Sequence, residues 1–161
     1  MLFFDTSETT AFWQQACGAE GLDPAAPHHA GTFSAPGGGY DDAFNEELAA
    51  LVRDGQKRGT THMQLEFEHR AIPLREIGHY WIVTTTGGTP FCIVRITNVA
   101  IVPYKDVTPE FAASEGEGDL SLAFWQGAHI DYFKDQCRQW GFKWRDSQPV
   151  VCESFELIYR P

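Results

Sequence analysis

Two short segments of the sequence carry side chains that could do chemistry. Residues 55–61 (GQKRGTT) place Lys57 three positions before Thr60, and residues 115–119 (EGEGD) place three carboxylates between glycines. A lysine can activate a neighbouring hydroxyl, while carboxylates can move protons or hold a divalent cation. By residue type alone, however, Lys57 is more typical of a cation at a helix C-terminus, and the acidic segment is more typical of a solvated turn.

Several other functional motifs are absent from the sequence. Gly37-Gly38-Gly39 is not followed by Lys-Ser/Thr, so no phosphate-binding loop is formed, and neither GxSxG nor HExxH occurs. The pair His28-His29 lacks the spacing of zinc ligands and indicates a loop. The four cysteines form no CxxC pair, and we expect them to be reduced and mostly buried. No secretion signal or membrane-spanning run is visible, which predicts a cytoplasmic protein without a membrane partner.

The elements that must position these residues are helices first, then strands, then helices and a last strand. This order, without strict βα alternation, predicts an α+β fold with a curled antiparallel sheet or small barrel. An irregular connection is expected over 21–40, and a hairpin turn at Gly87-Gly88. The first helix should bury Phe12 and Trp13 and stop at Gly18. The predicted helices are 7–17, 41–54, 109–114 and 120–140, and the predicted strands are 60–67, 80–86, 91–104 and 150–159.

The charge of the chain is distributed unevenly. The net charge is -10, but residues 1–52 contain no Lys or Arg, and all 12 basic residues lie in residues 53–161. An acidic protein is a poor partner for nucleic acid unless its cations gather on one face. A local basic face is therefore required for RNA binding, and these residues could build it: Arg53, Lys57, Arg58, Arg70 and Arg75.

About two thirds of the chain resembles the longer bacterial form of the ASCH domain, a relative of the PUA-like barrel. The sequence departs from the family pattern at Gly59, where many members have alanine before the threonine and where glycine should add backbone freedom beside the site. It also departs at His79, where the family has an acidic residue. The resemblance is carried by NEEL (45–48), GQK (55–57), IPLREIG (72–78), PFCIVRIT (90–97), VPYKDVT (102–108), EGEGDLSL (115–122), Phe124-Trp125, His129, Phe133, Cys137 and PVVCESF (149–155).

This resemblance implies a PUA-like curled antiparallel β-barrel flanked by helices. It implies a single ASCH domain over residues 1–161, in which residues 1–40 form an N-terminal helix and an irregular extension. It also implies a role linked to RNA. Some members are ribonucleases, and others remove the acetyl group from N4-acetylcytidine with a lysine, a threonine and a glutamate that correspond to Lys57, Thr60 and Glu115.

Both reactions could use this small set of groups. In amide hydrolysis, a Lys57 whose pKa is lowered by burial would act as a base and Glu115 would pass a proton to the leaving amine. In RNA cleavage, cations would offset the charge on phosphorus, and carboxylates would hold Mg²⁺ or Mn²⁺. Glu117 and Asp119 are the candidate metal ligands. Candidate substrate-binding residues are Arg58, Arg70, Tyr80, Trp125 and His129.

The sequence thus favours binding and hydrolysis of single-stranded RNA, with a divalent cation as the cofactor and no organic cofactor. Deacetylation of a modified nucleoside is the first alternative. A module that binds RNA without turnover is the second. The acidic N-terminal third is expected to be a packing helix.

Overall fold

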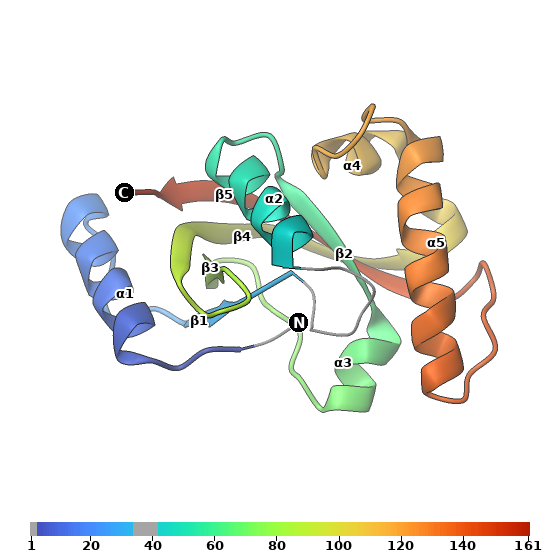
Figure 1. Ribbon diagram of the computed structural model, residues 1–161, viewed down its shortest axis with the longest axis horizontal. Coiled ribbons are helices and arrows are strands. Elements are labelled where there is room, and N and C mark those ends of the chain that lie inside the picture. Colours follow the sequence, from blue (N-terminus) through green and yellow to red (C-terminus); the bar gives the residue numbers. More distant parts are fainter. Residues whose placement is uncertain (1–2, 34–41) are drawn as a thin grey trace.

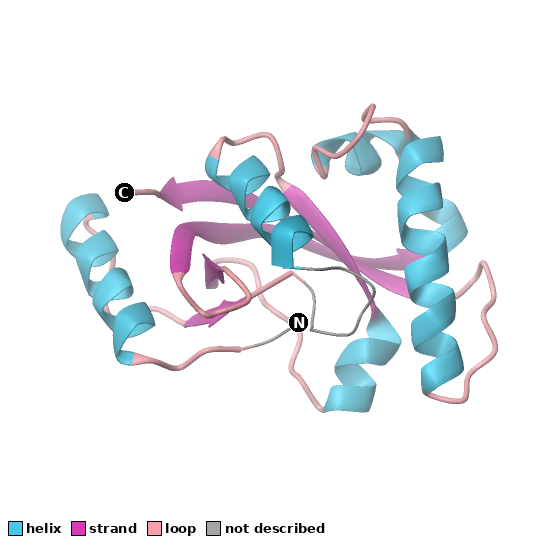
Figure 2. Cartoon of the chain, viewed as in Figure 1, coloured by secondary structure: helices cyan, strands magenta, loops and turns pink. Residues whose placement is uncertain are grey.

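The computed structural model describes residues 3–33 and 42–161. Its centre is a five-stranded sheet in the order β1-β3-β4-β5-β2, drawn as magenta arrows in Figure 2. The edge strand β1 pairs with β3 in parallel, whereas all other neighbours pair antiparallel. The strands are β1 (His28–Gly31), β2 (Gly59–Met63), β3 (Tyr80–Thr84), β4 (Pro90–Pro103) and β5 (Pro149–Tyr159).

The long strands β4 and β5 give the sheet its curl. They pair from Ile93 opposite Tyr159 to Pro103 opposite Pro149, and the register shifts at Ile93/Val94 and at Ile96/Asn98. Such irregularities bend a strand and increase its local twist. The α+β prediction is confirmed, but a closed barrel is not formed. In the described part of the chain, the edge strands β1 and β2 are not paired with each other.

Helices cover the sheet in three places (Figure 1). Helix α1 packs over β1 and β3 through Trp13, α2 packs on β3 and β4 through Leu48 and Val52, and α5 packs on β2 and β5 through Phe133. Three apolar clusters therefore share one sheet. The helices are α1 (Ser7–Glu20), α2 (Asp42–Arg53), α3 (Gln64–Arg70), α4 (Pro109–Ser114) and α5 (Leu122–Gln139), with a 3₁₀ turn, η1, at Tyr104–Asp106.

Three predicted elements need correction. Helix α1 continues past Gly18 to Glu20, and its C-cap Gly21 adopts the left-handed conformation with φ 66°. The predicted strand 60–67 is a strand only to Met63, after which α3 begins without a side-chain cap. The connection 21–40 contains β1, a strand that hydrogen bonds to β3 rather than to a sequence neighbour. The rest of that connection, 34–40, lies outside the described residues.

Other predictions are confirmed. Trp13 is buried and Phe12 half-buried, and the Gly87-Gly88 turn joins β3 to β4. All four cysteines are buried and unpaired. Within the described ranges, no helix is long and apolar enough to cross a membrane.

Candidate functional site

The segments 55–61 and 115–119 meet because the backbone around Lys57 packs directly on the acidic loop. The N–H of Arg58 donates to the carbonyl of Ser114 at 2.8 Å. A Cβ on Gly116, whose φ is +74°, would lie 2.6 Å from the carbonyl oxygen of Gln56. A Cβ on Gly59 would lie 2.8 Å from Ser114 Oγ. Glycine at 59 and 116 therefore allows close approach, and Gly59 is a packing requirement rather than the added backbone freedom that its departure from the family pattern implied.

Lys57 is the cation at this junction, and it is almost entirely buried, with 1% of its surface exposed. Its Nζ lies 3.0 Å from Glu115 Oε2 and 2.6 Å from Glu117 Oε1. It also donates to the carbonyl oxygen of Glu115 at 3.4 Å, and it lies 5.4 Å from the centre of the Phe33 ring. An ammonium group has three protons, so these oxygens account for its whole donor capacity.

Glu115 is held by neutral donors as well as by the lysine. Its Oε1 accepts hydrogen bonds from Thr61 Oγ1 and from Trp125 Nε1, each at 2.6 Å. His129 stacks on Trp125 with ring centres 4.4 Å apart, and its Nε2 lies 3.8 Å from the same carboxylate oxygen. Glu115 is thus a fixed, buried counter-charge.

Charge governs the protonation of this pair. Burial alone lowers the pKa of Lys57, but the charges of Glu115 and Glu117 and their hydrogen bonds raise it above its ordinary value. Burial likewise raises the pKa of Glu115, yet Lys57, His129 and the two neutral donors lower it to about 2. The expected lysine base with a lowered pKa is therefore wrong. In the resting protein Lys57 is an ammonium and Glu115 a carboxylate.

A small cavity of about 50 Å³ opens beside this cluster. Thr60 and His62 line it from one face of β2, while Lys57, Glu115 and Glu117 line it from the junction. The Thr60 hydroxyl has no hydrogen-bond partner among the described residues. The other residues that line the cavity are Phe33, Phe44, Leu48, Thr61, Ala128, His129 and Tyr132.

The structure brings some of the predicted substrate-binding residues to this cavity and leaves others elsewhere. His129 lines it, and Trp125 lies behind it as a donor to Glu115. Arg58 is exposed outside it, and Arg70 contacts Glu66 at 3.4 Å. Tyr80 is buried under α1, with its ring 5.2 Å from that of Trp13.

The expected basic face does not form as such, because two of its five members are buried in ion pairs. Lys57 pairs with Glu115 and Glu117, and Arg75 pairs with Glu153. Lys57 and Arg75 are therefore not exposed cations that could bind phosphate.

The acidic loop does not fit a divalent cation. Glu117 is turned to Lys57, whose Nζ lies between the two glutamates where a metal would need to sit. Asp119 is exposed and its Oδ1 accepts the N–H of Ser121 at 2.9 Å, which lowers the pKa of Asp119. In the part of the chain that the structure describes, no group of three or more His, Cys, Asp or Glu side chains could hold a metal ion.

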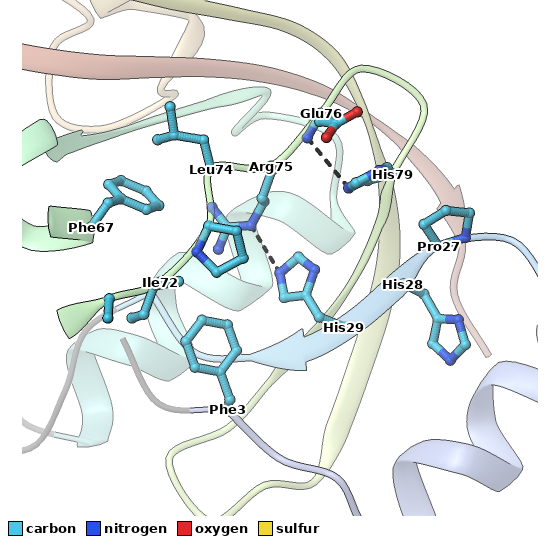
Figure 3. Close-up of a pocket in the computed structure, with 12 residues that line it drawn as sticks. Phe3, Pro27, His28, His29, Phe67, Ile72, Leu74, Arg75, Glu76 and His79 are labelled. Carbon is cyan, nitrogen blue, oxygen red and sulfur yellow. Dashed lines mark hydrogen bonds between the residues drawn. The ribbon is translucent and has the colours of Figure 1, made fainter.

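A second buried cluster was not predicted as part of a site. Arg75 donates from Nε to His29 Nε2 at 2.9 Å (Figure 3). It also forms an ion pair with Glu153 and lies over the Trp81 ring. Burial, and then the charge of Arg75, lower the pKa of His29 to about 2, so its ring is neutral. Only the resemblance, which includes both the 72–78 and 149–155 segments, could have signalled this cluster, because these residues are far apart in sequence.

His62 is another residue that the sequence reading missed. It is buried, its Nε2 has no hydrogen-bond partner, and its Nδ1 lies 3.9 Å from Glu66 Oε2. Burial, followed by the nearby positive charge of Arg75, lowers its pKa well below the ordinary value. A neutral imidazole with a free nitrogen therefore faces the cavity of Lys57.

Comparisons with known proteins agree with the fold. The family model of the ASCH domain matches residues 39–159. The crystal structure of an ASCH domain from Lactobacillus crispatus JV V101 is similar with a TM-score of 0.83 and 30% identity, covering 99% of this chain and 100% of that one. Protein EF3133 from Enterococcus faecalis V583 gives a TM-score of 0.77 and 27% identity, covering 94% of this chain and 92% of that one.

The comparison with curated proteins gave no match. The family match spans most of the sequence and contains every residue of the Lys57 cluster, from the junction of α2 and β2 to the acidic loop. The chain therefore belongs to the ASCH domain family, a PUA-like family of RNA-associated domains.

Proposed function

We propose that this protein is an amidohydrolase that removes a small acyl group from a modified nucleobase, with N4-acetylcytidine as the substrate class. The observation that carries the proposal is the buried Lys57 ammonium, shared by Glu115 and Glu117, at a small cavity that also exposes the Thr60 hydroxyl. Such a set can attack a carbonyl, stabilise the resulting oxyanion and protonate a leaving amine.

The size of the cavity favours this reaction over RNA cleavage. A buried water needs roughly 10–15 Å³ of such volume, and the cavity has about 50 Å³. It therefore accommodates about four heavy atoms, which is the size of an acetamide unit. A phosphodiester with its two flanking sugars is far larger.

The charge of the cavity points in the same direction. Lys57 is the cation of the cluster, and two carboxylates compensate it. The net negative charge there would repel a phosphate group but would not repel a neutral amide. This reverses the order expected from the sequence, which placed ribonuclease activity first.

In the proposed reaction each group has one step. The Thr60 oxygen forms a bond to the carbonyl carbon and its proton passes to Glu117, which is less buried than Glu115 and contacts Lys57. Lys57 moves one N–H from the Glu115 carbonyl oxygen, its longest hydrogen bond at 3.4 Å, to the substrate carbonyl oxygen as that oxygen becomes negative. The C–N bond then breaks as Glu117 returns the proton to the nitrogen. Water hydrolyses the ester on Thr60 in the same way and releases acetate, while Glu115 holds Lys57 in place.

Incubation of the purified protein with N4-acetylcytidine, followed by chromatography, tests the proposal. We expect cytidine and acetate to be released in equal amounts, and the rate to be unchanged by EDTA. Lys57→Met should release none, whereas Lys134→Met, which alters an exposed lysine on α5, should match the natural protein.

Labelled single-stranded RNA, with and without Mn²⁺, separates the alternatives. Cleavage of the RNA without release of cytidine would support the ribonuclease hypothesis. Binding of RNA without either reaction would support a non-catalytic module. Either outcome rejects the amidohydrolase proposal.

A further inference from the structure

A second pocket, distinct from the cavity of Lys57, lies between β1 and the segment 71–79. Its volume is about 480 Å³, which falls within the range of small-molecule sites. Figure 3 shows the rings of Phe3, His29 and Phe67 together with Ile72 and Leu74 around one space. We call this space the β1 pocket.

The wall of the β1 pocket is mostly apolar and aromatic, although Glu76 also lines it. His29 is neutral because burial, and then the charge of Arg75, lower its pKa, and its ring lies 5.8 Å from that of Phe3. The guanidinium of Arg75 is itself compensated by Glu153. A flat, uncharged, heteroaromatic ligand gains stacking and apolar contact on such a wall, whereas an anionic ligand finds the charge of Arg75 already compensated by Glu153.

The β1 pocket and the cavity of Lys57 adjoin. His62 lines the cavity, Phe67 lines the β1 pocket, and their rings meet edge to face with centres 5.9 Å apart. Thr60 is the cross-strand partner of Glu153, which binds Arg75 of the β1 pocket. Both spaces therefore lie along the same face of the curled sheet.

The small cavity has room for an acyl group but not for the nucleoside that carries it. We propose that the β1 pocket binds the base and ribose of that nucleoside, a proposal that rests on the proposed function. His62 stands at the boundary, and its unpaired Nε2 is the polar contact for the edge of the base next to the scissile amide.

Titration with cytidine, the expected product, tests this without turnover. In ¹H–¹⁵N spectra, the amides of 72–75 and of His29 should shift, and the dissociation constant should rise about tenfold or more in Ile72→Trp, because the new ring fills the pocket. Ile77→Trp is the matched control, since Ile77 is 65% exposed in the same segment and does not line the pocket. It should bind cytidine as the natural protein does.

Kinetics supply the second readout. Ile72→Trp should raise KM for N4-acetylcytidine about tenfold or more while kcat at saturation is retained. Leu74→Trp narrows the same pocket and replaces Ile72→Trp if that variant does not fold. A folded pocket variant that keeps the natural KM and cytidine affinity would overturn the proposal.

The outcomes separate this proposal from the reaction itself. Turnover with an unchanged KM in Ile72→Trp rejects the β1 pocket and leaves the amidohydrolase in place. Cytidine binding at the β1 pocket without any turnover rejects the reaction and supports the pocket as a nucleoside site. If the protein neither binds cytidine nor turns over N4-acetylcytidine, both proposals are rejected.

Discussion

Two buried cation–carboxylate clusters lie on the same curled sheet, and they differ in what they leave unpaired. In the first, Lys57 is shared by two glutamates beside a cavity that exposes the Thr60 hydroxyl. In the second, Arg75 ties Glu153 of β5 to His29 of β1 and covers the Trp81 ring.

A buried ion pair alone is therefore weak evidence for catalysis. The Arg75 cluster connects three segments of the fold, and its guanidinium is always protonated, so it cannot exchange protons. The Lys57 cluster holds one more carboxylate than charge balance needs, next to a nucleophile. That surplus, rather than burial, distinguishes the candidate catalytic site.

The largest expected difference between the clusters is in turnover after both partners of an ion pair are replaced. Arg75→Met alone should lower the free energy of unfolding by about 3–5 kcal/mol, because Glu153 is left buried and unpaired. Adding Glu153→Leu should restore much of it and keep turnover at saturating substrate. Lys57→Met with Glu115→Leu should likewise recover stability, measured by urea unfolding, yet show no turnover. Turnover in that folded double variant would remove the distinction between the clusters.

The glycines of the acidic loop provide a second, smaller contrast. Both Gly116 and Gly118 have positive φ, but a Cβ on Gly116 meets the backbone of Gln56, whereas a Cβ on Gly118 meets the ring of Phe124. Phe124 is exposed and can move. Gly116→Ala should therefore cost more than about 2 kcal/mol and most of the activity, and Gly118→Ala about 1 kcal/mol. Equal losses in urea unfolding would show that the contact with Gln56 does not position Lys57.

Much of the secondary structure could be predicted, for reasons visible at particular residues. Helix α2 follows the spacing of Phe44, Leu48 and Leu51, and α4 agrees with its prediction residue for residue. Strand β1 was missed because it has four residues and pairs in parallel with a distant strand. The end of β2 at Met63 was missed because Gln64–Phe67 continues without a turn residue or a cap.

The candidate site was less accessible to sequence reasoning. Lys57 and Glu115 are separated by 58 positions, so only the family resemblance joined them. The direction of the Lys57 pKa depended on a second carboxylate, Glu117, whose contact no spacing rule gives. Arg75 and His62 could be recognised as buried only once the sheet had placed them.

The two clusters should also affect the free energy of unfolding in different pH ranges, and this is the smallest of the three expected differences. The folded pKa of His29 is about 2, below its unfolded value of about 6.5, so the unfolded chain binds more protons and stability falls as pH drops below about 6.5. The folded pKa of Glu115 is also about 2, so its contribution is complete above about pH 4.5 and is lost only below that.

Unfolding titrations at several pH values check this order. His29→Gln should flatten the slope between about pH 6.5 and 5, by at most about 1.4 kcal/mol per pH unit, and Glu115→Gln should act only at lower pH. A slope in the upper range that is unchanged by His29→Gln would contradict the neutral, Arg75-bound imidazole.

The most direct test of the central claim compares two neighbouring threonines of β2 that both line the cavity. Thr61 donates to Glu115 at 2.6 Å, whereas Thr60 borders the cavity without a described partner. In the cytidine-release assay, Thr60→Val should lose about a thousandfold or more in kcat with little change in stability, and Thr61→Val should lose about 1–2 kcal/mol of stability while still turning over. Release of cytidine by Thr60→Val at the natural rate would contradict the account.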